Sequence, residues 1–189
     1  MYVFVGKTGF GHEHGVEGKI KSGWLVLGAS KQAGEIIFDM RSFRADTPAA
    51  RRYVGLSGTT DRRTRRQIDA NMLGPSVLDI AHYPTATFRL RSAVPLQKKG
   101  RPTATMYRLQ GDLTLHGVTQ PLQIDVEVVP QKEGLRMRGR FSLLQTWFGI
   151  TPFSKALGFV GVSDQLTIYG DLWLIDPSAK SRRRNNSSR

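Results

Sequence analysis

The chain has 189 residues, of which 39% are hydrophobic and 9% aromatic, and it contains no cysteine. This length suffices for one sizeable domain, and the missing cysteines exclude disulfides and thiolate metal sites. No stretch approaches the roughly 20 apolar residues of a membrane-spanning helix, and residues 1–11 lack the basic and apolar regions of a secretory signal. The formal net charge of +13 favours anionic partners through its long-range field but confers no specificity by itself.

Alternation of apolar and polar residues predicts β-strands along most of the chain, because a period of two places successive side chains on opposite faces. The clearest case is 107–128, where alternation is interrupted by a turn at 117–121 and then resumes. Turn signals such as Ser22-Gly23 separate neighbouring runs. In chain order the predicted strands are 2–9, 16–21, 24–28, 36–41, 85–91, 107–116, 122–128, 135–143 and 165–174.

Residues 60–81 depart from this alternation and predict a short helical insertion. Thr60 is suited to cap the helix and Asp61 favours its N-terminus. Apolar residues then recur at helical spacing until Gly74-Pro75, after which a one-turn helix is expected.

Eight or nine strands in hairpin order, each with one apolar face, predict an all-β fold. An eight-stranded antiparallel barrel removes the exposed edges and encloses a space able to hold one ligand. A two-sheet sandwich is the alternative. Residues 1–176 are expected to form this domain, and 177–189, with Lys180 and four arginines, a basic and disordered tail.

Three segments resemble the YceI-like family of lipocalin-like, polyisoprenoid-binding barrels. They are "ANMLGPSVLDIAHYPTATF" at 70–88, "GDLTLHGVTQPLQ" at 111–123 and "FGITPFSKALGFVGVSDQLTIY" at 148–169. The family shares an insertion leading to a "YP-x-A-x-F" strand, an "L-T-x-H/R-G-V-T-x-P" hairpin and a late "FGI". The resemblance spans most of 2–175 in order. It implies an eight-stranded antiparallel barrel whose interior holds a long isoprenoid chain, in the periplasm or outside the cell, whereas the missing leader leaves a cytoplasmic location as the alternative.

Nine apolar residues are the candidates for contact with such a chain. Seven alternate inward on predicted strands, and two lie in the aromatic, glycine-punctuated segments 147–153 and 158–162, which are candidates for a lid or portal over one barrel mouth. The alternative for each of them is plain core packing, because small barrels can be filled by side chains. The candidates are Phe38, Phe88, Leu113, Leu115, Ile124, Phe141, Phe148, Phe153 and Ile168.

Polar candidates for a headgroup are two histidines and three arginines. His12 and His14 form an H-x-H pair, which on a strand would project to one face and can chelate a metal. The flanking glycines favour a turn instead, and no metal site is expected. Arg62, Arg65 and Arg66 cluster on the predicted helix and would offset the charge of a pyrophosphate.

No sequence signature of catalysis is present, and His116 is expected to hydrogen-bond near a turn. The leading hypothesis is therefore a non-enzymatic protein, without a cofactor, that carries or sequesters a long apolar lipid. Two alternatives stay open. The first is an enzyme that uses a metal at His12 and His14. The second is binding of an anionic membrane surface or nucleic acid by the basic helix and tail, with no sequence-specific nucleic-acid partner expected. A homodimer through edge strands also stays open.

Overall fold

The computed structural model of the protein describes residues 1–96, 104–155 and 159–176. The predicted tail at 177–189 lies outside the described residues, as do residues 156–158, which include the first glycine of one lid segment. Within the described ranges, none of the helices has both the length and the apolar character needed to cross a bilayer.

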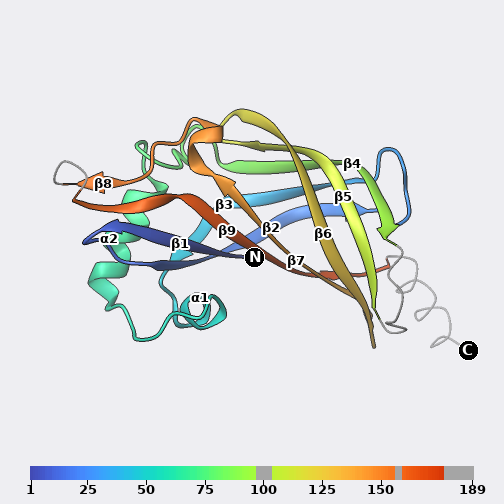
Figure 1. The fold of residues 1–189 in the computed structure, drawn as a ribbon, viewed down its shortest axis with the longest axis horizontal. Coiled ribbons are helices and arrows are strands. Elements are labelled where there is room, and N and C mark those ends of the chain that lie inside the picture. The colour runs from blue at the N-terminus through green and yellow to red at the C-terminus, as the bar shows by residue number, and fades with distance from the viewer. Residues whose placement is uncertain (97–103, 156–158, 177–189) are drawn as a thin grey trace, which may run out of the picture.

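Eight antiparallel strands close into a barrel (Figure 1). Each strand pairs with the next one along the chain from β1 to β7, then β7 pairs with β9, and β9 returns to β1. This closure confirms the predicted barrel and excludes the sandwich. A two-residue strand, β8, lies on the outer edge of β9. The strands are β1 (Tyr2–Gly9), β2 (His14–Leu25), β3 (Gly34–Ala45), β4 (Thr85–Leu96), β5 (Thr105–Leu115), β6 (Val118–Gln131), β7 (Gly134–Leu144), β8 (Ser154–Lys155) and β9 (Val160–Leu174).

The turn predicted at Ser22-Gly23 is wrong, because β2 runs through it without interruption. The register of β2 against β3 shifts between Ile20 and Ser22, so the strand is irregular there but keeps its partner. Gly23 lies so close to β3 that a Cβ atom would come within 2.8 Å of the Glu35 carbonyl oxygen. The glycine therefore marks a close approach of two backbones rather than a reversal of the chain.

Two helices lie between β3 and β4, at or near one end of the barrel (Figure 1). The predicted helix is α2 (Arg62–Leu73), but its N-cap is Asp61, whose carboxylate accepts from the amides of Arg63 and Thr64. Thr60 was predicted to be the cap; its hydroxyl bonds elsewhere. Turns, not the expected one-turn helix, follow α2.

The other helix, α1 (Pro48–Tyr53), was not predicted from the sequence. It has only six residues, and its start is specified locally by Thr47, whose hydroxyl accepts from the Ala50 amide at 3.1 Å, and by Pro48 in the first turn. Gly15 on β2 lets this helix approach closely, because a Cβ atom there would come within 2.9 Å of the Ala50 backbone.

The apolar faces of the strands point into the barrel, as the alternation predicts. On β5, Leu109 and Leu113 are 2% and 7% exposed, while Gln110 and Asp112 alternate with them on the outward face. On β6, Ile124, Val126 and Val128 are buried in the same way. Val77, which follows α2, belongs to the same core, so the insertion closes over the barrel interior.

Candidate functional site

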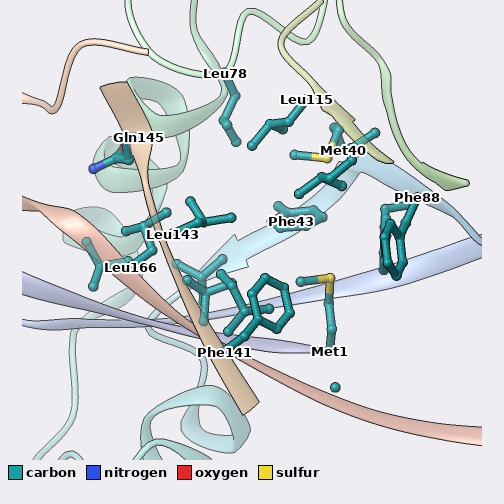
Figure 2. A pocket seen from close by; sticks show the side chains of 18 of the residues that line it. Met1, Met40, Phe43, Leu78, Phe88, Leu115, Phe141, Leu143, Gln145 and Leu166 are labelled. Carbon is teal, nitrogen blue, oxygen red and sulfur yellow. The ribbon is translucent and has the colours of Figure 1, made fainter. Parts of the chain in front are cut away.

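The barrel interior contains an apolar cavity of about 250 Å³. Its walls come from all eight barrel strands and from α2 and the turn after it. Figure 2 shows Phe43, Phe88 and Phe141 among the side chains that face this space, with Gln145 at its edge. The polar side chains in the lining are only His14, Asn71 and Gln145 among the described residues. An apolar cavity of roughly 150 Å³ is already enough to hold benzene, so this interior has room for part of an alkyl chain.

Eight of the nine predicted contact residues line this cavity. They belong both to the hydrophobic core and to the cavity wall, so packing and lining are not exclusive roles for them. Five come from β3 to β6, two from β7 and β9, and one from the segment before β8. These residues are Phe38, Phe88, Leu113, Leu115, Ile124, Phe141, Phe153 and Ile168.

Phe148 is the ninth predicted contact residue, and it does not line the cavity. It ends the short 3-10 helix η1 (Gln145–Phe148), where it is 2% exposed and packs in the core. The helix turns this side chain into the barrel end, while its neighbour Trp147 is 53% exposed. Of the two aromatic residues proposed for a lid, only Phe153 reaches the cavity wall.

A second, polar hollow adjoins the apolar cavity. It lies among the β1–β2 turn, the α1–α2 connection and the first turns of α2, and it measures about 450 Å³. His14 and Ile68 line both spaces and thus form the boundary between them. We call this second space the polar chamber; its polar lining includes Lys7, His12, Glu13, His14, Asp46, Arg51, Ser57, Thr59, Thr60, Asp61 and Thr64.

Asp46 is the centre of a hydrogen-bonded cluster in the chamber wall. Its Oδ2 accepts from His14 Nδ1 at 2.8 Å and from the Thr60 hydroxyl at 3.2 Å. Its Oδ1 accepts from the Gly15 amide at 3.1 Å and from Arg51 Nη1 at 3.2 Å. Thr60 is therefore occupied by this cluster, which explains why Asp61 rather than Thr60 caps α2.

These partners keep Asp46 ionised although its side chain is only 2% exposed. Burial acts to raise the pKa of Asp46, but the hydrogen bonds from His14, the Gly15 amide and Arg51 outweigh it, so the pKa lies below its usual value. An ionised carboxylate only accepts hydrogen bonds, so His14 Nδ1 must carry a hydrogen. No local pattern indicates this cluster, because Asp46 lies 32 residues from His14.

The H-x-H pair is not arranged as a strand pair. β2 begins at His14, so His12 lies in the preceding turn, exposed and within the chamber lining. No cluster of three or more histidine, aspartate or glutamate side chains with the geometry of a metal site occurs among residues 1–96, 104–155 and 159–176. His14 is instead held by Asp46.

Arg62, Arg65 and Arg66 line neither space. Arg62 and Arg66 are exposed on α2, and Arg65 is half-buried. The α2 residues that do face the interior are Ile68, Asn71 and Met72. Helical periodicity places Arg62 and Arg66 on faces of α2 other than the one that covers the cavity. Arg65 precedes Ile68 by one turn on the same side of the helix and is half-buried there without lining either space.

His116 lies in the β5–β6 turn and has a structural environment. Its φ is +50°, and its Nδ1 is 3.3 Å from the Phe148 carbonyl oxygen, to which it can donate. Its ring packs against Tyr83, with centroids 4.5 Å apart. These contacts tie the β5–β6 turn to η1 and to the start of β4.

Comparisons with known proteins agree with this architecture. The family model of the YceI-like domain matches residues 3–173. BcnA of Burkholderia cenocepacia is 16% identical, with 89% of this chain and 92% of that chain covered and a TM-score of 0.55. A polyisoprenoid binding domain from Saccharophagus degradans is 12% identical, with coverages of 93% and 94% and a TM-score of 0.55. The Campylobacter jejuni YceI protein is 13% identical, with coverages of 85% and 84% and a TM-score of 0.52.

No curated protein matches the sequence. At these low identities the solved structures support the fold alone, and the family model carries the assignment. The match extends from the first strand of the barrel to the end of β9, and thus includes the cavity and the insertion that covers it. The chain belongs to the YceI-like domain family.

Proposed function

We propose that the protein binds a long apolar lipid of the isoprenoid class inside its barrel, and that it carries or sequesters this lipid without transforming it. The observation that carries this proposal is the apolar cavity of about 250 Å³, whose lining has three polar side chains among the described residues. The polyisoprenoid binding domain of Saccharophagus degradans has the same fold. Family membership supports a periplasmic or secreted site of action.

The energetics of burial favour such a ligand. Each methylene transferred from water into an apolar site contributes roughly 0.8 kcal/mol, so one five-carbon isoprenoid unit contributes about 4 kcal/mol before the cost of ordering it. A branched, flexible chain can also follow the irregular wall formed by Met40, Phe43 and Phe141.

Organic extraction of the purified protein followed by mass spectrometry tests this proposal directly. We expect a co-purifying prenyl lipid, or uptake of an added C20 prenyl alcohol with a stoichiometry of one. Absence of bound lipid together with no uptake of added prenyl compounds would overturn the proposal. The matched control is Gly170→Leu, because Gly170 lines the cavity and a leucine side chain there would fill part of it.

A second candidate, docking to an anionic membrane, rests on a different observation. Phe10 and Phe159 are 82% and 64% exposed, and they are neighbours, because the Phe10 amide donates to the Phe159 carbonyl at 2.8 Å. Exposed Lys7 lies on β1, which ends just before Phe10, and exposed Lys155 lies on β8, which precedes Phe159 in the chain. Figure 1 places the β1–β2 turn, β8 and α2 at the same end of the molecule.

We infer that this aromatic tip enters the headgroup region of an anionic bilayer, while lysines and the exposed α2 arginines contact lipid phosphates. Aromatic insertion combined with basic residues is a common basis of peripheral membrane binding. Phe10→Ser with Phe159→Ser should reduce co-sedimentation with phosphatidylglycerol vesicles at least about tenfold. Trp24→Ser with Trp173→Ser, at two exposed tryptophans outside this tip, is the control. Equal vesicle binding by all three proteins, or binding to DNA alone, would contradict the inference.

A further inference from the structure

His14 stands where the apolar cavity meets the polar chamber. It is one of two residues that line both spaces, the other being the apolar Ile68. A lipid chain in the cavity that extends toward this boundary therefore reaches an imidazole before any other polar chamber side chain. This inference rests on the proposed lipid-binding function and concerns the polar end of the ligand.

The orientation of the imidazole is fixed from behind. Nδ1 donates to Asp46 at 2.8 Å, and Asp46 is itself held by Arg51, Thr60 and the Gly15 amide. Because Nδ1 carries the hydrogen in this arrangement, the neutral ring presents Nε2 as a hydrogen-bond acceptor on its opposite side. The aspartate thus selects the tautomer that a hydroxyl donor requires.

Nε2 is also available for such a bond. Among the described residues, no hydrogen bond joins it to the protein, and the one fully buried side-chain nitrogen or oxygen without a partner is Arg65 Nε. The side chain of His14 is 16% exposed. An incoming ligand can therefore reach Nε2 without breaking an existing contact.

The charge of the polar chamber favours an uncharged headgroup. Its lining contains two permanent cations, Lys7 and Arg51, and three carboxylates, Glu13, Asp46 and Asp61. Arg51 is already paired with Asp46 at 3.2 Å. A diphosphate would bring further negative charge to a chamber with no excess of cations, whereas an alcohol adds none.

We propose that His14, oriented by Asp46, is the headgroup site of the protein and accepts a hydrogen bond from the hydroxyl of a long-chain prenyl alcohol. The apolar chain then occupies the barrel cavity. Asp46 is a positioning residue, because it acts through the imidazole. From the sequence we expected a pyrophosphate bound by Arg62, Arg65 and Arg66. The proposed headgroup is instead a neutral alcohol bound by His14.

The test compares three C20 ligands that share one hydrocarbon chain: geranylgeraniol, its methyl ether and its diphosphate. Each displaces the fluorescent probe 1-N-phenylnaphthylamine from delipidated protein. The ether can only accept a hydrogen bond, so the affinity ratio of alcohol to ether reports the acceptor on the protein. In the wild type we expect the alcohol to bind about fivefold more tightly than the ether, as one hydrogen bond of about 1 kcal/mol gives, and the diphosphate to bind more weakly than the alcohol.

His14→Ala should abolish the preference for the alcohol, so that alcohol and ether bind with equal affinity. His82→Ala is the matched control, because His82 also pairs with an aspartate, Asp79, at 2.7 Å but lines neither space. Asp46→Asn gives a second readout. In this variant the amide oxygen of the asparagine takes the place of Oδ1 and accepts from the Gly15 amide and Arg51. The asparagine NH₂ then faces His14 Nδ1 and donates to it, so the imidazole hydrogen moves to Nε2. The ether should then bind as tightly as the alcohol.

The outcomes separate the two proposals. If no C20 ligand displaces the probe from the wild-type protein, lipid binding itself fails. If all ligands bind but His14→Ala keeps the wild-type ratio of alcohol to ether, only the headgroup site is overturned. Tightest binding of the diphosphate, lost on substitution of Arg62, Arg65 and Arg66, would also overturn it.

Discussion

Two glycines face each other across β7 and β9 in the cavity wall, and they provide a sharp test of the cavity. Gly139 and Gly170 are register partners, and both line the cavity. A Cβ atom at Gly170 would have the Gly139 carbonyl oxygen, 3.9 Å away, as its nearest neighbour. A Cβ atom at Gly139 would lie 2.8 Å from Val126 Cγ1. The two positions therefore share a location but differ in available space.

Gly170→Leu should fill the cavity and change binding and stability in opposite directions. The side chain adds four carbons where the ligand would lie, which costs the ligand about 3 kcal/mol at roughly 0.8 kcal/mol per methylene, or about a hundredfold in affinity. Removing a strand glycine contributes roughly 0.5–1 kcal/mol to stability, and burial of the leucine adds about 1.5 kcal/mol or more. For a chain of this size the midpoint of unfolding should rise by at least about 4 °C.

The assays are probe displacement by geranylgeraniol and thermal unfolding of the delipidated protein. Gly139→Leu is the comparison: it should also impair binding, but it should lower the unfolding temperature, because its Cβ meets Val126. A Gly170→Leu protein that unfolds at a lower temperature and still takes up the prenyl alcohol with wild-type affinity would refute the reasoning. It would mean that the cavity neither accommodates the leucine nor holds the ligand.

Three further predictions concern the scaffold. Leu109→Ala should lower the free energy of unfolding by about 2–5 kcal/mol in urea denaturation, because Leu109 is the largest fully buried side chain among the described residues; a loss below about 1 kcal/mol would contradict this. The hydrogen bonds of Arg136, at 2.8 and 2.6 Å, lower the pKa of Asp171 against the opposing effect of burial. The stabilising contribution of Asp171 is therefore complete above the ordinary carboxylate pKa of 3.8 and is lost as the pH falls through the lowered pKa. Below that ordinary pKa, thermal unfolding of Asp171→Asn should depend less on pH than that of the wild type. Gly15→Ala should cost about 1–3 kcal/mol in the same urea assay, because its Cβ would collide with the Ala50 backbone, and unchanged stability would show that α1 shifts freely.

The barrel could be predicted from the sequence because its strands alternate cleanly. Along the middle of β5 and β6 the inward face is buried, and a period of two fixes which residues point inward. The same rule placed on the cavity wall the seven strand residues that were predicted as ligand contacts. Phe148 and Phe153 were predicted from the aromatic content of their loops, which carries no information on orientation. Phe153 lines the cavity, whereas the 3-10 helix η1 turns Phe148 into the core.

The polar chamber could not be predicted in the same way, because it depends on contacts between distant segments. His14 begins β2, Asp46 follows β3 and Thr60 precedes α2, and no local period relates them. Charge clustering drew attention to Arg62, Arg65 and Arg66, yet solvent exposure is the usual environment of clustered arginines. The arginine that lines the polar chamber and bonds to Asp46 is Arg51. Its helix α1 is too short to produce a periodic pattern in the sequence.

The chemistry of Asp46 itself argues for a role beyond stability. A buried carboxylate must recover the cost of its desolvation from its partners, and replacing a buried ion pair by apolar residues is often neutral or stabilising. Asp46 recovers that cost with four donors contributed by β2, α1 and the α1–α2 connection. A barrel that needed only a closed end could meet that need with apolar side chains, as Val77 and Leu78 do nearby. His14 Nε2 has no hydrogen-bond partner in residues 1–96, 104–155 and 159–176, and its ring is held by an ionised group next to an apolar cavity. This arrangement is expected where a ligand supplies the remaining hydrogen bond.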